Sequence, residues 1–80
     1  MQTLSFYIDV DSDIQFGKPV FKGTRVPVQS LFWHLEKGIT LDEFLEDFPG
    51  VKREQAEAVI EWSAKHFELP EIINDETVIR

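Results

Sequence analysis

Histidine and aspartate are the residues of this chain with the clearest capacity for chemistry, and their spacing decides what they can do. His34 and His66 each lack the His partner one helical turn away and the Cys neighbour that a metal site needs. We therefore expect His34, which follows Trp33, to lie on a helix surface or at an interface. Neither histidine is predicted to bind a metal ion.

The aspartates at positions 9, 11 and 13 have the alternate spacing of a calcium-binding loop, but the rest of that loop is missing. Its sixth position requires Gly and its twelfth requires Glu, and these places hold Ile14 and Val20. The pattern therefore favours a charged turn over a calcium site.

The sequence has no nucleophile elbow, no zincin motif and no glycine-rich phosphate loop. It also has no cysteine, which removes disulfides, thiolate zinc sites and thiol nucleophiles. We therefore expect a protein that is not an enzyme and that carries neither a cofactor nor a metal ion.

Charge is unevenly distributed along the chain. Eight basic and 15 acidic residues give a net charge of −7, which argues against a protein that coats nucleic acid by charge alone. However, residues 18–25 carry three cations and no acid. If the chain binds DNA, this basic loop and the first turn of the last helix would make the contacts. The candidates are Lys18, Lys22, Arg25, Lys52, Arg53 and Gln55.

The first elements predicted along the chain, which position these residues, are short extended pieces. Alternating apolar residues predict a strand over residues 4–10. Two extended pieces, 19–21 and 26–28, flank a turn that contains Gly23. Because Pro19 and Pro27 cannot donate to a strand ladder, these pieces are edge strands or extended loop.

Three amphipathic helices are predicted after the extended region. The first begins near Pro27 and ends at Gly38, and the second begins after the capping-box residue Thr40 and ends at 49–50. The third runs from about residue 52 or 53 to 66 or 67. Their apolar stripes predict one core of Leu31, Leu35, Leu41, Phe44, Leu45, Phe48, Val59, Ile60 and Phe67.

The 80 residues are enough for one small domain. We expect residues 1–27 to form a β or extended arm with the basic loop, 28–67 a three-helix core, and 68–80 a tail that is either a docked strand or an extended arm. The fold class is mainly α: a three-helix bundle of helix-turn-helix type with short N-terminal strands. No apolar run spans a membrane and the N-terminus lacks a signal-peptide pattern, which favours a cytoplasmic protein.

Aromatic residues make up 12% of the chain, more than one small core needs. They either fill the core or form a homodimer face or a groove for a partner. The apolar residues of the tail would suit docking onto another protein. The candidates for a partner or dimer interface are Tyr7, Phe16, Phe21, Trp33, Trp62, Ile72, Ile73, Val78 and Ile79.

Two segments resemble the hallmarks of the domain of unknown function 433 (DUF433) family. Residues 17–28 read G-K-P-V-F-K-G-T-R-V-P-V, similar to the family's G-K-P-x-I/F-x-G-T-R-I/V-P-V. Residues 37–49 read K-G-I-T-L-D-E-F-L-E-D-F-P, similar to G-x-S/T-x-E-E-I-L-E-D-Y-P, and residues 51–64 match the family's last helix. The similarity covers about residues 8–67. In the first motif, Arg25 either staples the loop to the acidic side near Glu46 and Asp47 or contacts a ligand.

The resemblance implies a homeodomain-like helix-turn-helix core. It also implies an antitoxin, because many family members are so described and are encoded beside a PIN-like nuclease toxin. We therefore expect a non-enzymatic antitoxin, a homodimer that binds a nuclease toxin and also operator DNA. The alternative is a DNA-binding transcriptional regulator without a toxin partner.

Overall fold

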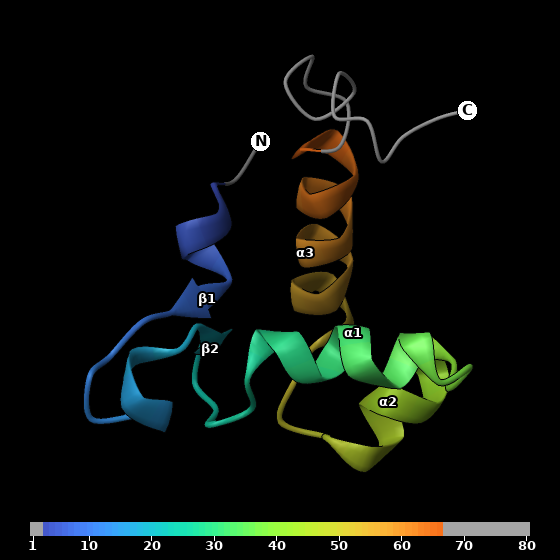
Figure 1. Ribbon diagram of the computed structural model, residues 1–80, viewed down its shortest axis with the longest axis horizontal. Helices are drawn as coiled ribbons and strands as arrows, with labels where there is room; N and C mark the ends of the chain where they lie inside the picture. Colours follow the sequence, from blue (N-terminus) through green and yellow to red (C-terminus); the bar gives the residue numbers. More distant parts are fainter. Residues whose placement is uncertain (1–2, 67–80) are drawn as a thin grey trace, which may run out of the picture.

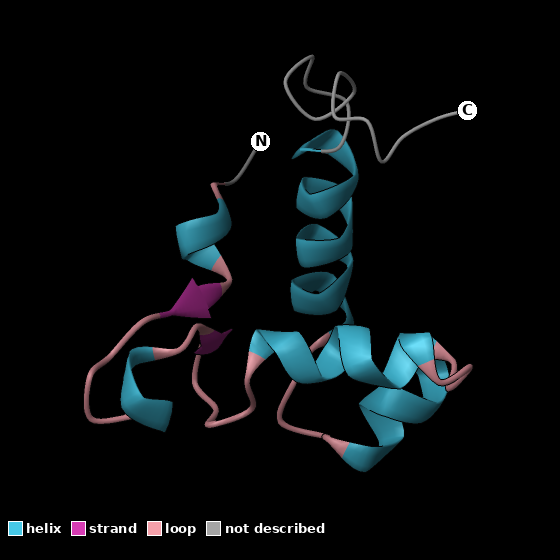
Figure 2. Cartoon of the chain, in the orientation of Figure 1, coloured by secondary structure: helices cyan, strands magenta, loops and turns pink. Residues whose placement is uncertain are grey.

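Short extended elements precede three helices in the computed structural model, which describes residues 3–66 (Figures 1 and 2). The mainly helical class with short N-terminal strands is confirmed. In chain order the elements are the 3-10 turn η1 (Leu4–Phe6), strand β1 (Ile8–Asp9), the 3-10 turn η2 (Gln15–Gly17), strand β2 (Val20–Phe21), and the helices α1 (Val28–Glu36), α2 (Leu41–Asp47) and α3 (Arg53–His66).

The two strands form a minimal antiparallel hairpin. Ile8 lies opposite Phe21 and Asp9 opposite Val20, and Val20 also bridges to Pro27. The predicted strand over residues 4–10 is wrong in its first half, which forms η1. The reason is that β2 is bounded by Pro19, which has no N–H, and by the turn after Phe21, so no longer ladder is available.

The helix ends follow the predicted signals. Pro27 caps α1 with a φ of −62°, and Gly38 after its end adopts a φ of 85°. Thr40 and Glu43 form the capping box of α2, with the Thr40 hydroxyl accepting from the Glu43 amide at 3.1 Å and the Glu43 carboxylate accepting from the Thr40 amide at 3.0 Å. Within residues 3–66, no helix is long and apolar enough to span a membrane.

The core lies where the hairpin meets the three helices. Besides the helix residues expected there, it contains both residues of β2, so the helical stripes alone do not seal it. Phe21 packs against Phe44, with ring centroids 6.3 Å apart. Of the predicted core, Phe67 lies outside the described residues. The fully or nearly fully buried apolar residues are Val20, Phe21, Leu31, Phe44, Val51, Ala56 and Val59.

Helix α3 stands across α1, and the N-terminal segment (residues 3–9) runs beside α3 on the same side of α1 (Figure 1). This segment therefore faces the last helix of the fold although it lies at the opposite end of the described chain. The arrangement places side chains from η1, α1 and α3 around one region of the surface.

Candidate functional site

An open groove of about 450 Å³ lies between the N-terminal segment, the start of α1 and the second half of α3. Most of the lining side chains are apolar. We call this feature the apolar groove; it is lined by Leu4, Ile8, Lys18, Pro19, Pro27, Val28, Gln29, Phe32, Val59, Trp62 and Ser63.

The charge of the apolar groove differs from that of the chain. Asp and Glu make up 15 of the 80 residues, yet none of the lining residues is acidic. Among the described residues that line it, Lys18 is the one with a permanent charge, and its side chain is exposed. Trp62, 44% exposed, forms part of the α3 wall. The groove therefore suits an apolar segment, with a cation at its rim for an acidic neighbour.

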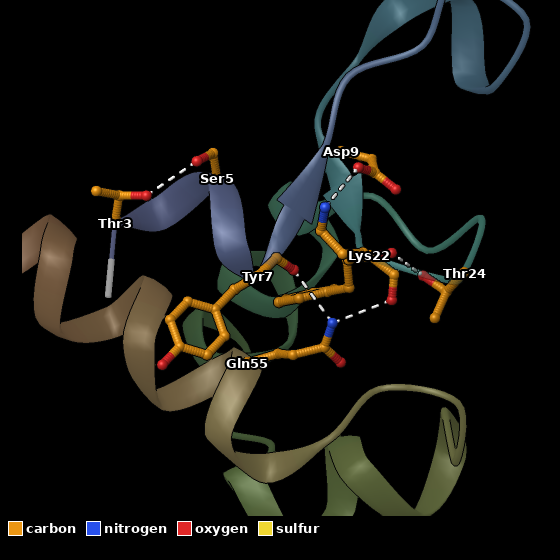
Figure 3. A network of polar contacts seen from close by, with 8 residues as sticks. Thr3, Ser5, Tyr7, Asp9, Lys22, Thr24 and Gln55 are labelled. Carbon is orange, nitrogen blue, oxygen red and sulfur yellow. Dashed lines mark hydrogen bonds and ion pairs between the residues drawn. The ribbon is translucent and has the colours of Figure 1, made fainter. Parts of the chain in front are cut away.

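Gln55 connects the N-terminal segment to α3. Its amide Nε2 donates to the carbonyl oxygens of Tyr7 and Lys22, both at 3.1 Å (Figure 3). Its Oε1 accepts from the Lys52 amide at 2.8 Å. The residue is only 7% exposed. The interpretation of Gln55 as a base-reading residue is therefore wrong, because all of its polar atoms are bound inside the protein. Instead it positions the hairpin against the start of α3.

The predicted cations are divided between different places. Lys18, Lys22, Arg25 and Lys52 are all exposed, so the basic loop is on the surface as expected. Lys22 forms an ion pair with Asp9 at 3.3 Å. Within the part of the chain that the structure describes, no ion pair joins Arg25 to Glu46 or Asp47, so the first of the two alternatives for Arg25, a staple to these acids, is not formed.

Lys22 and Lys52 come together at a second hollow of about 380 Å³, beside the start of α3. We call it the polar hollow; it is lined by Phe6, Tyr7, Lys22, Gly23, Gly50, Lys52, Glu54 and Gln55. It unites two predicted DNA-contact lysines, but the Glu54 carboxylate lies at the same rim. An anion there would meet both signs of charge.

Arg53 is engaged with carboxylates. It hydrogen-bonds and pairs with Asp42 of α2, and it lies 3.8 Å from the Glu57 carboxylate one turn along α3. The hydrogen bond to Asp42 raises the pKa of Arg53, so its charge persists at any working pH. These carboxylates offset the positive charge that a phosphate would meet there.

The predicted interface aromatics fall into three groups. Phe21 is fully buried in the core, so its assignment to an interface is wrong. Tyr7 is half-buried at the polar hollow, whereas Trp33 and Trp62 are 48% and 44% exposed. The tail candidates Ile72, Ile73, Val78 and Ile79 lie outside the described residues.

Phe16 is the most exposed large apolar residue of the described chain, at 97%. Its backbone has a φ of 57°, and that of Gln15 has a φ of 52°. This left-handed conformation costs an L residue about 1–2 kcal/mol. The Gln15 side chain holds the turn by donating to the Arg25 carbonyl oxygen at 3.1 Å. The fold therefore holds an aromatic ring in solvent on a strained turn, and strained backbone of this kind clusters at functional sites.

His34 is packed within the helical layer rather than presented to a ligand. Its ring meets the edges of Phe44 and Phe48 at centroid distances of 5.2 and 5.5 Å, and Nδ1 lies 2.6 Å from the Ser30 carbonyl oxygen. Over residues 3–66 no cluster of three or more His, Cys, Asp or Glu residues could hold a metal ion.

Sequence reasoning missed most of the apolar groove, because residues such as Leu4, Val28 and Phe32 look like ordinary core positions. No local pattern distinguishes a buried apolar face from one left open. The bond of Gln55 to the Lys52 amide did leave a signal: Gln55 stands three residues after Lys52, the residue before α3, where the Gln of a capping box is found.

These features define a small, mainly helical protein with a two-stranded N-terminal hairpin and an exposed apolar groove. The family described as protein of unknown function (DUF433) matches residues 8–62, and the chain belongs to this family. A solved structure of a DUF433 member from Anabaena variabilis ATCC 29413 is similar, with a TM-score of 0.65 and 24% identity. The match covers 76% of this chain and 60% of that one, so this chain spans less than two thirds of its relative. Among curated proteins, no sequence matched the chain.

Proposed function

We propose that this protein is a non-enzymatic antitoxin that binds a PIN-like nuclease through the apolar groove. The observation that carries the proposal is an open, acid-free apolar groove on a strongly acidic chain. An apolar anchor of the nuclease would enter the groove and release its water. The net charge of −7 on the whole chain would complement a nuclease that is basic because it binds RNA.

The strained Phe16 supports a second contact in the same complex. A fully exposed ring on a turn that costs free energy gains stability only when it is buried by a partner. The turn leads directly into Lys18 and Pro19, which line the apolar groove. One partner could therefore contact both features.

Co-expression with the product of the neighbouring gene, followed by calorimetric titration of the two purified proteins, tests the proposal. Trp62→Asp places a charge in the groove and is expected to weaken binding about 30-fold or more, the effect of losing an interface anchor. Trp33→Asp is the matched control, since Trp33 is equally exposed on α1 but does not line the groove. Absence of a complex, or equal effects of the two substitutions, would contradict the proposal.

A second candidate function is DNA binding as a transcriptional regulator. It rests on the polar hollow, where Lys22 and Lys52 meet beside the start of α3. In this proposal α2 and α3 act as a homeodomain-like helix-turn-helix, and α3 enters the major groove with its first turn. A gel-shift titration on the chain's own promoter at two salt concentrations tests it. Lys22→Ala and Lys52→Ala should each reduce the salt dependence, and no specific band at low salt would exclude the function.

The homodimer expected from the sequence also belongs to the proposal. Two copies would present two basic loops to DNA or two grooves to nucleases. A light-scattering mass twice that of the 80-residue chain is the expected result. A monomer mass over the same concentrations would remove this part of the proposal without affecting the binding of a nuclease.

A further inference from the structure

We infer that the chain's own tail, through Ile72 and Ile73, occupies the apolar groove when no partner is bound. The inference concerns the free protein and stands whether or not the proposed nuclease is the partner. It begins from where the described chain ends. Helix α3 forms one wall of the groove at Val59, Trp62 and Ser63, and the structure describes the chain as far as His66, the last residue of α3.

The tail has the length to reach the groove. Trp62 and His66 are four residues apart on one helix, a rise of about 6 Å. The link of residues 67–71 spans up to about 17 Å when extended. It contains Pro70, which cannot continue a helix and so favours a change of direction. Ile72 and Ile73 can therefore return along α3 to the level of Trp62.

The tail also has the matching chemistry. Ile72 and Ile73 are a pair of apolar side chains bounded by Glu71 on one side and by Asp75 and Glu76 on the other. The groove offers apolar walls, no acidic lining residue and the cation Lys18 at its rim. An external partner would then have to displace the tail, which makes the tail a competitor for the site.

Disulfide trapping in the full chain tests the inference directly, because the protein has no native cysteine. The test chain carries Ser63→Cys in the groove wall and Ile73→Cys in the tail. The matched control replaces Ser63→Cys by Ser5→Cys, an exposed η1 residue that does not line the groove. After mild oxidation, free thiols are counted, and monomers and dimers are separated without reductant.

The inference predicts loss of both thiols in a monomeric product, at least ten times faster than in the control. Lys18→Glu in the test chain should slow this trapping several-fold, because it puts a like charge at the rim. A disulfide-linked dimer as the main product would show that a second copy's tail fills the groove, and it would overturn the inference. Equal trapping in test and control chains would overturn it as well.

Discussion

Replacing Gln55 by alanine tests how the hairpin is held to the last helix. The substitution removes three hydrogen bonds made by one buried side chain and leaves the Tyr7 and Lys22 carbonyl oxygens without these donors. With about 1 kcal/mol for each hydrogen bond, and more where a buried group is left unpaired, the free energy of unfolding should fall by about 2–4 kcal/mol. A chain of this size has roughly 4–12 kcal/mol in total. The change should therefore remove a large share of the stability.

Gln55→Glu sharpens the prediction because it changes the donor and little else. In the variant, an oxygen replaces Nε2 and faces two carbonyl oxygens, which repel a carboxylate but accept from a protonated acid. The pKa of that glutamate should therefore be raised in the folded state above its unfolded value of about 4.3. In the pH range between those two values the folded state holds the proton that the unfolded state has lost. The variant should thus lose stability, relative to the native chain, as pH rises above about 4.3.

Urea unfolding followed by circular dichroism at pH 4.5 and pH 7 measures both effects. Gln29→Ala and Gln29→Glu are the matched controls, since Gln29 is an exposed residue of another helix. They should change the free energy of unfolding by no more than about 0.5 kcal/mol. If Gln55→Ala behaves like Gln29→Ala, or if Gln55→Glu is equally stable relative to the native chain at both pH values, the role of Gln55 in holding the hairpin to α3 is refuted.

Three further substitutions test other parts of the structure. Phe44→Ala should lower the free energy of unfolding by about 3–5 kcal/mol because it empties the centre of the core; a loss below 1 kcal/mol by urea titration would contradict the packing. Phe16→Gly should leave the urea midpoint unchanged or raise it, since glycine accepts a positive φ, while it weakens binding of the nuclease at least tenfold by calorimetry. Arg53→Ala should move the urea midpoint little, because its ion pairs are exposed. The shift should be the same at pH 6 and pH 9, because the pKa of Arg53 is raised and the side chain stays charged throughout that range.

The helices and their ends were predictable from the sequence because their signals are local. Pro27, Gly38 and the pair Thr40 and Glu43 act through backbone groups within a few residues of themselves. The exposed position of Phe16 was predictable only in part. Its aromatic type indicated an interface, but its positive φ depends on the Gln15 contact with Arg25 across the loop.

What could not be predicted depends on contacts between distant segments. Gln55 hydrogen-bonds to the carbonyl oxygens of Tyr7 and Lys22, which lie 48 and 33 positions away in the sequence. A glutamine side chain on a helix gives no sign of such distant partners. The alternation over residues 4–10 indicated a strand, but the length of that strand was set by β2, which Pro19 and the following turn keep short. The apolar groove is lined by residues of η1, α1 and α3, so it is a property of the packing of three elements rather than of any one.

Fluorine NMR of the full chain labelled with 5-fluorotryptophan measures the central claim most directly. The protein has two tryptophans, so Trp62 in the groove and Trp33 outside it each give one resonance. On addition of the unlabelled nuclease, the account predicts that the Trp62 resonance shifts or broadens with saturation while the Trp33 resonance moves little. A complex in which the Trp62 resonance stays at its free position would show that the partner binds elsewhere and would contradict the assignment of the apolar groove.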